Sequence, residues 1–317
     1  MPLQGPAKVA IIGAGYVGAS TAFALLFSPI VKEIVLVDIN RARAEGEAMD
    51  LAHAATLIRP VKIYAGNPAD CAGARIIIFT AGANQQPGET RLDLVHRNTA
   101  IVREALPPLL QHCPDALIIM VANPVDVLTY VAWKLSGLPE TKVLGSGTVL
   151  DSARFRHLLS RHLHVDPRNI HAYVIGEHGD TEVPVWSLAN VAGVYLEEFY
   201  LLDGTIEEDA FRIEISRQVK EAAYTIIERK GATAYGVALA LSRITESILR
   251  DEKSVLTVSS VIRDLYGLEG EVALSLPCVV GSQGREKVLA IPLGTGELAA
   301  LRHSATILQD IITRLRL

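Results

Sequence analysis

Two short stretches of this 317-residue sequence contain residues whose types and spacing could do chemistry, and the first is a glycine-rich loop. Gly13-Ala14-Gly15-Tyr16-Val17-Gly18 fits G-x-G-x-x-G, directly after a predicted strand (residues 9–13) and at the start of a predicted helix (residues 17–27). Such glycines permit a tight turn, a close approach to pyrophosphate and close helix packing, while the helix N-terminus attracts phosphate. Asp38 follows Gly18 by 20 residues, at the end of the next predicted strand. A carboxylate there binds ribose hydroxyls and repels a 2′-phosphate, so the pattern favours NAD over NADP.

The second stretch is Ile175-Gly176-Glu177-His178-Gly179-Asp180, which places a histidine in a glycine-flanked loop after a predicted strand (residues 170–176). A histidine can give and take a proton near neutral pH. Asp151 and Arg154 are three residues apart on a predicted helix (residues 148–163), so they share one face. Taken separately, these residues are more typical of a structural loop and a surface ion pair than of catalysis.

The elements that must position these residues follow two patterns. In the first half, short apolar runs alternate with helical patterns, and residues 76–79 and 117–121 are continuously apolar, which is typical of parallel strands covered on both faces. Beyond Gly145 the pattern becomes mixed: an unassigned stretch around residues 183–194 and two helices precede further strands near residues 255–262, 272–280 and 287–291. We therefore expect an α/β chain: a Rossmann-type doubly wound parallel sheet over residues 1–145, followed by a mixed α+β catalytic domain over residues 146–317.

The composition excludes several classes of protein. Half of the residues are apolar, 21% are charged and the net charge is −5, which is ordinary for a globular chain and gives no basic footprint for nucleic acid. The apolar runs are too short to span a membrane, and the first residues do not resemble a signal peptide. Three widely spaced cysteines, Cys71, Cys113 and Cys278, are expected to be reduced and buried. We predict a cytoplasmic protein with no nucleic-acid or membrane partner.

Several collinear motifs resemble those of the NAD-dependent L-lactate dehydrogenases, within the lactate/malate dehydrogenase family. Besides G-A-G-Y-V-G (13–18), they are A-G-A-N-Q-Q-P-G-E-T-R (81–91), A-N-P-V-D-V (122–127), G-S-G-T-V-L-D-S-A-R-F-R (145–156), G-E-H-G-D (176–180) and K-G-A-T-A-Y-G (230–236). The resemblance covers essentially the whole chain.

The resemblance implies a role for each matching residue. His178 would be the acid and base of the reaction, Asp151 would orient and charge its imidazole, and Arg154 would bind the substrate carboxylate in a two-bond fork. Arg91, on a lid formed by residues 82–90, would polarise the carbonyl, and Asn123 would orient the nicotinamide ribose and the substrate oxygen. The residues implied to bind NAD are Gly13, Gly15, Tyr16, Val17, Gly18, Asp38, Ala81, Gly82 and Asn123.

The resemblance also indicates a substrate. Malate-specific relatives carry arginine at the position of Gln85, and a neutral glutamine leaves a second substrate carboxylate without a counter-charge. Thr233 matches the small residue that limits the substrate's side chain. Pyruvate and L-lactate are therefore favoured; the alternatives are a malate dehydrogenase and a chain that binds NAD without catalysis.

Two further positions and the assembly state follow from the family alone. Arg156 and His171 match positions that bind fructose 1,6-bisphosphate at a subunit interface in allosteric bacterial members. The family also implies a homotetramer. The spacing of His157, His162 and His164 does not resemble a metal site, so we expect no metal.

Overall fold

The computed structural model describes residues 7–83, 88, 91–203 and 209–315. Its centre is a nine-stranded sheet in the order β12-β11-β10-β6-β5-β4-β1-β2-β3. The six neighbouring strands from β6 to β3 run parallel, in the doubly wound order that the sequence predicts. These strands are β1 (Ala7–Ile12), β2 (Val31–Val37), β3 (Lys62–Ala65), β4 (Ile76–Phe79), β5 (Leu117–Met120) and β6 (Val143–Gly145).

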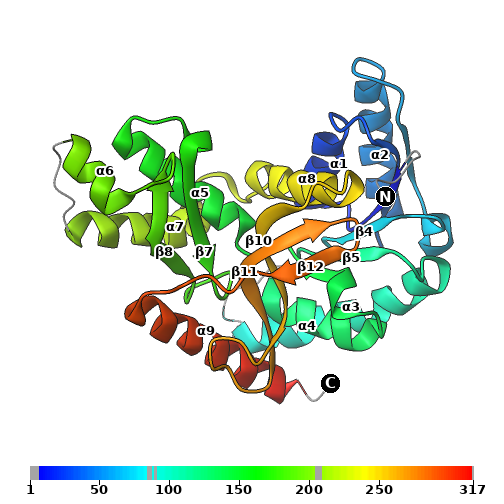
Figure 1. Cartoon of the computed structure of the whole chain (residues 1–317). Helices are drawn as coiled ribbons and strands as arrows, with labels where there is room; N and C mark the ends of the chain where they lie inside the picture. The colour runs from blue at the N-terminus through cyan, green and yellow to red at the C-terminus, as the bar shows by residue number, and fades with distance from the viewer. Residues whose placement is uncertain (1–6, 84–87, 89–90, 204–208, 316–317) are drawn as a thin grey trace.

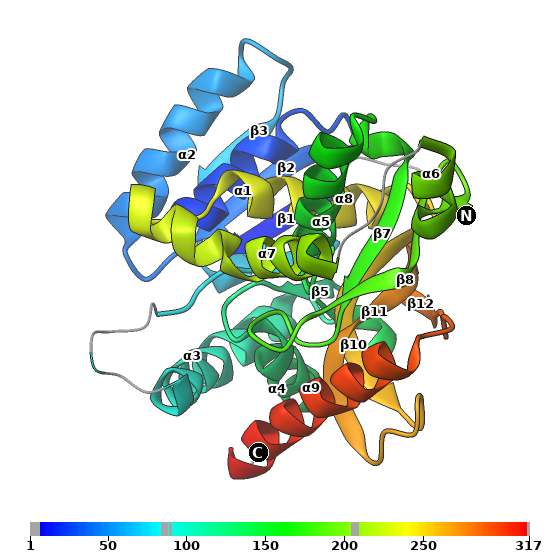
Figure 2. The ribbon, with the colours of Figure 1, turned by 90° about the vertical axis from the view of Figure 1, so that its left-hand side faces the viewer.

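Helices cover both faces of this sheet (Figures 1 and 2). On one face lie α1 (Tyr16–Leu25), α2 (Arg41–Ala55) and α8 (Tyr235–Leu249). On the other lie α3 (Arg91–His112), α4 (Val125–Ser136) and α9 (Thr295–Arg314). Every residue of β4 and β5 is buried, as the continuously apolar runs predict.

A smaller sheet, β7-β8-β9, lies beside the large one (Figure 1). Its strands are β7 (Ile170–Ile175), β8 (Val183–Val191) and β9 (Val194–Tyr195), packed with α5 (Val149–Leu163), α6 (Leu196–Asp203) and α7 (Asp209–Lys230). Short 3-10 turns over Pro68–Cys71, Glu140–Lys142 and Pro167–Asn169 complete the chain between these elements.

The last three strands extend the large sheet, which the sequence pattern did not predict. They are β10 (Ser254–Arg263), β11 (Glu271–Gly281) and β12 (Gly284–Val288), paired antiparallel to one another. Ser259 of β10 pairs with Gly145 of β6, which joins strands from the two halves of the chain. The small sheet is attached next to this seam, because the backbones of Gly176 and Ser275 exchange hydrogen bonds of 2.8 and 2.9 Å.

Local features explain how the ends of the first elements form. Gly13 has a φ of +100°, which favours glycine. A Cβ added at Gly18 would overlap the carbonyl oxygen of Gly13. The turn between β1 and α1 therefore needs both glycines. The Asn40 side chain accepts the N–H of Arg43 and thereby caps α2.

The cysteines and the helices agree with the expectations from composition. Cys71, Cys113 and Cys278 are all buried and free. Across the described residues, every helix falls short of the length and apolar character that a bilayer crossing requires.

The two glycines of the turn at α1 should respond differently to alanine. Gly18→Ala places a methyl group into the Gly13 carbonyl and should destabilise the fold by about 1–3 kcal/mol. Gly15→Ala is the matched control, because its Cβ meets nothing within 4 Å and its φ of −72° suits any residue. Thermal unfolding measures both; equal midpoints would contradict the steric account.

Candidate active site

The glycine loop and Asp38 lie together at the carboxyl ends of β1 and β2. Asp38 Oδ2 accepts the N–H of Ala14 at 2.6 Å, and its Oδ1 accepts the N–H of Asn40 at 2.8 Å. The space over Gly15 is open to 4 Å, so the backbone can be approached there. Tyr16 is 70% exposed and Ile39 is fully exposed, which leaves apolar surface beside the loop. An anion-binding helix start, a free glycine face and an adjacent carboxylate fit a dinucleotide.

The loops that follow β4 and β5 are fastened to each other by Asn98 of α3. Its side-chain oxygen accepts the N–H of Ala83 at 2.7 Å, and its nitrogen donates to the carbonyl oxygen of Asn123 at 2.7 Å. Ala81 and Gly82 lie just before Ala83, and Gly82 packs so closely that a Cβ would meet the Ala122 methyl group at 2.9 Å. Asn123 is exposed and is therefore free to contact a ligand at this edge of the sheet.

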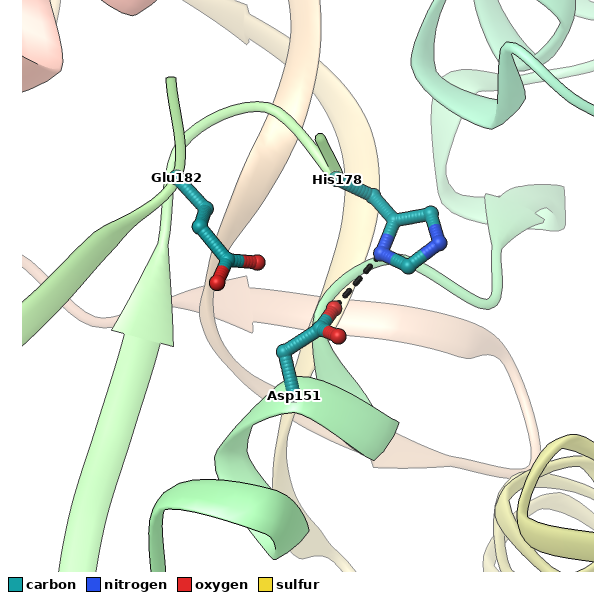
Figure 3. A group of neighbouring side chains, drawn as sticks. All are labelled: Asp151, His178 and Glu182. Atoms are coloured by element: carbon teal, nitrogen blue, oxygen red, sulfur yellow. Dashed lines mark hydrogen bonds and ion pairs between the residues drawn. The ribbon is translucent and has the colours of Figure 1, made fainter. Parts of the chain in front are cut away.

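A buried carboxylate on α5, that of Asp151, holds both a histidine (Figure 3) and an arginine. His178 Nδ1 and Asp151 Oδ2 are 2.6 Å apart, and Arg154 Nη1 donates to Asp151 Oδ1 at 2.7 Å. The Asp151 side chain is 1% exposed, whereas those of Arg154 and His178 are 14% and 25% exposed. The structure thus brings His178 to two residues of α5 that precede it by 27 and 24 positions in the sequence. Since Nδ1 is engaged, the Nε2 atom is the one that remains for a substrate.

The charges of this cluster set its protonation. Burial disfavours the imidazolium, but the charge and hydrogen bond of Asp151 outweigh burial and raise the pKa of His178 to about 9. Burial also opposes ionisation of Asp151, yet His178 and Arg154 hold the pKa of this carboxyl below its ordinary value. The histidine is therefore charged at neutral pH and can donate a proton.

Two buried acids beside His178 were missed by the sequence analysis. Asp126 of α4 is 1% exposed, and its Oδ2 accepts the backbone N–H of His178 at 2.7 Å. Burial raises the pKa of Asp126 to about 6. Its signal in the sequence was an aspartate at the start of the mostly apolar run from Val125 to Ala132, every residue of which is buried.

The second missed acid is Glu182, which precedes β8 and is 4% exposed. The side chain of Glu182 lies beside those of Asp151 and His178 (Figure 3). One carboxyl oxygen of each acid and one ring nitrogen of His178 lie within 4.8 Å of one another. Burial, followed by the negative charge of Asp151, raises the pKa of Glu182 to about 8. An acidic residue before an apolar strand gives no signal that separates it from a surface residue.

The remaining predicted residues are placed as follows. Thr233 is half-buried in the connection between α7 and α8. Gln85 lies outside the described residues, and Arg91 begins α3 with its side chain likewise outside them. Arg156, on α5, is partly buried, and burial lowers its pKa. His171 is exposed on β7.

Comparison with known proteins identifies the family. Residues 7–145 match the lactate/malate dehydrogenase NAD binding domain, and residues 148–316 match the lactate/malate dehydrogenase alpha/beta C-terminal domain. The chain belongs to the lactate/malate dehydrogenase family. As a member of this family that contains its NAD binding domain, the chain is an NAD-dependent dehydrogenase.

Individual relatives of this dehydrogenase are similar over almost their full lengths. An L-lactate dehydrogenase of Moorella thermoacetica is 81% identical over 317 residues, which is 100% of both chains. One from Thermoanaerobacter sp. is 54% identical and covers 97% of this chain and 99% of its own. The crystal structure of the minor L-lactate dehydrogenase from Enterococcus mundtii, in the ligands-bound form, aligns with a TM-score of 0.95 at 38% identity, covering 98% of this chain and 99% of that one.

Removing the charge of Asp151 should lower the pKa of His178. In Asp151→Asn the burial of His178 is no longer outweighed, so its pKa should fall from about 9 toward or below 6.5. Histidine NMR titration, with His178→Asn to assign the resonance, measures this change. Asp166→Asn, which removes an exposed carboxylate bound to Arg168, is the matched control. A His178 pKa unchanged in Asp151→Asn would contradict the assignment of the shift to this pair.

Proposed function

We propose that this dehydrogenase is an L-lactate dehydrogenase, which reversibly reduces pyruvate with NADH to L-lactate. The observation that carries the proposal is the buried Asp151 carboxylate, bonded at once to His178 and Arg154. This arrangement places a proton donor beside a cationic fork, which is what a 2-oxo acid requires. The relatives that match the whole chain are named L-lactate dehydrogenases, in agreement with this reaction.

Each residue of the proposed active site has a separate role in the reaction. Arg154 binds the pyruvate carboxylate, and His178 donates the proton from Nε2 to the carbonyl oxygen. Asp151 holds the imidazole by Nδ1 and stabilises its charge before the transfer. Arg91 polarises the carbonyl when the segment that carries Gln85 closes, and Asn123 orients the substrate oxygen. Bound NADH supplies the hydride.

The cofactor site uses residues from the carboxyl edge of the parallel sheet. We infer that Gly13, Gly15, Tyr16, Val17 and Gly18 receive the pyrophosphate at the start of α1. Asp38 binds the adenosine ribose, and Ala81, Gly82 and Asn123 hold the nicotinamide half. On this basis residues 1–145 form the NAD-binding domain and residues 146–317 the substrate-binding and catalytic domain.

The assay that tests the proposal is the loss of NADH absorbance with pyruvate or with oxaloacetate at neutral pH. We expect pyruvate to be strongly preferred. A preference for oxaloacetate would support a malate dehydrogenase instead, and NADH binding without turnover of either substrate would indicate a non-catalytic chain.

Gln85 is the residue that we expect to set this preference. Its neutral side chain leaves the second carboxylate of oxaloacetate without a counter-charge in a closed site, which is costly, whereas the methyl group of pyruvate loses nothing. Thr233 limits the size of the group that can enter. Gln85→Arg should therefore shift the ratio of kcat/KM values toward oxaloacetate by about 100-fold or more. Gln86→Arg adds the same charge one position along and is the matched control; equal shifts in both variants would contradict a specific role for Gln85.

Arg156 and His171 are proposed to bind fructose 1,6-bisphosphate at an interface of a homotetramer. Arg156 has no hydrogen-bond or ion-pair partner among the residues that the structure describes, and burial disfavours its charge. A bisphosphate would relieve this cost and favour the active assembly. We also infer that the enzyme works in the cytoplasm.

The bisphosphate site can be tested by the half-saturation for pyruvate. Fructose 1,6-bisphosphate should lower this half-saturation concentration in the unaltered enzyme. Arg156→Gln removes a charge-assisted contact and should therefore weaken the affinity for the bisphosphate about tenfold or more. Arg161→Gln, an exposed arginine on the same helix, serves as the control. A response that persists undiminished in Arg156→Gln would exclude this site, and ultracentrifugation with and without the bisphosphate tests the assembly.

A further inference from the structure

The active site contains a buried carboxyl group, that of Glu182, which the reaction described above does not use. Glu182 is 4% exposed, and its Oε1 has no hydrogen-bond partner among the described residues. Its side chain extends from the residue before β8 toward Asp151 and His178 (Figure 3). Ligand atoms of the three residues lie within 4.8 Å of one another. At this separation, and out of water, a change in the charge of Glu182 acts strongly on the imidazole.

The charged groups around Glu182 come from three parts of the fold. Asp151 and Arg154 face it from α5, His178 faces it from the turn after β7, and Lys220 acts on it from α7. Both oxygens of Asp151 are already bonded, one to Arg154 and one to His178. Asp126 of α4 accepts the backbone N–H of His178. Among the described residues, Oε1 of Glu182 therefore lacks a hydrogen bond, whereas Asp126 is held by the backbone of His178 and Asp151 by two side chains.

We propose that Glu182 is a positioning residue that acts through His178, because its carboxylate charge keeps the proton on the imidazole as the solution becomes alkaline. The inference rests on the proposed function, in which His178 donates this proton to pyruvate. It adds a residue that sets the pH range over which the donor remains charged.

The order of the two ionisations gives the direction of the effect. Burial and the charge of Asp151 raise the pKa of Glu182 to about 8, so its proton stays in place at neutral pH. The pKa of His178, raised to about 9, lies above this value. As the pH rises, Glu182 loses its proton to water first, and the new negative charge opposes the loss of the proton from His178. Pyruvate reduction, which needs charged His178, then extends to a higher pH than it would beside a neutral residue.

The experiment compares the unaltered enzyme with Glu182→Gln in the presence of NADH. Diethyl pyrocarbonate acylates imidazole only in its neutral form, so the pH dependence of its reaction rate titrates His178 once the background measured in His178→Asn is subtracted. In Glu182→Gln the inflection should lie about one pH unit lower than in the unaltered enzyme, because one nearby charge is missing. The alkaline limb of kcat/KM for pyruvate should move by the same amount. Glu182→Asp, which keeps the charge, should recover at least half of the shift.

The matched control is Glu269→Gln. It removes one exposed carboxylate that is distant from His178 in the sequence and lies in the turn between β10 and β11. It should leave the inflection in place. If Glu182→Gln does not fold, as judged by thermal unfolding and NADH binding, Glu182→Ser replaces it with the same expected shift. Identical inflections in folded Glu182→Gln or Glu182→Ser and in the unaltered enzyme overturn the proposal, as does a shift that Glu182→Asp does not reduce.

The two proposals fail in different ways. If His178→Asn still reduces pyruvate at the original rate, the proposed function is wrong, while the acylation titration still reports the effect of Glu182 on His178. If pyruvate turnover depends on His178 but the titration does not move, only the role of Glu182 is lost.

Discussion

The carboxylate of Asp151 is the charge on which the catalytic region depends. A carboxylate that is 1% exposed is costly to bury unless its charge is matched and its oxygens are bonded. Arg154 and His178 supply both, one on each oxygen. The groups that stabilise the buried charge are the same groups that we propose to bind and protonate the substrate. Stability of the site and its chemistry therefore rest on one set of contacts.

Holding this cluster in place requires the two sheets to be joined. Asp151 lies in the first turn of α5, just after β6, whereas His178 follows β7 in the smaller sheet. The hydrogen bonds between Gly176 and Ser275 fix the end of β7 against β11 of the large sheet. Asp126 then fixes the backbone of His178 to α4, next to the loop that contains Asn123. The proton donor is thus held relative to the edge of the sheet at which the cofactor loop lies.

The acids around His178 differ because their neighbours differ. Asp151 has two cationic partners, and its pKa is held below the ordinary value. Asp126 and Glu182 are also buried, and burial raises their pKa values to about 6 and about 8. A buried carboxyl without a matching cation keeps its proton more readily. One histidine therefore lies among carboxyls that ionise over different pH ranges, which allows its own charge to be adjusted without direct contact with the substrate.

Much of this protein could be predicted from sequence because the relevant signals are local. The glycines at 13, 15 and 18 and the apolar runs of β4 and β5 depend on neighbouring residues, and the structure confirms the elements that they predict. The pairing of β10 with β6 and the positions of Asp126 and Glu182 depend on contacts between distant segments. An acidic residue has the same identity in a sequence whether it is solvated or buried. Only the packing of α4, α5, β7 and β8 around His178 excludes water from these carboxyls, and that exclusion determines their protonation.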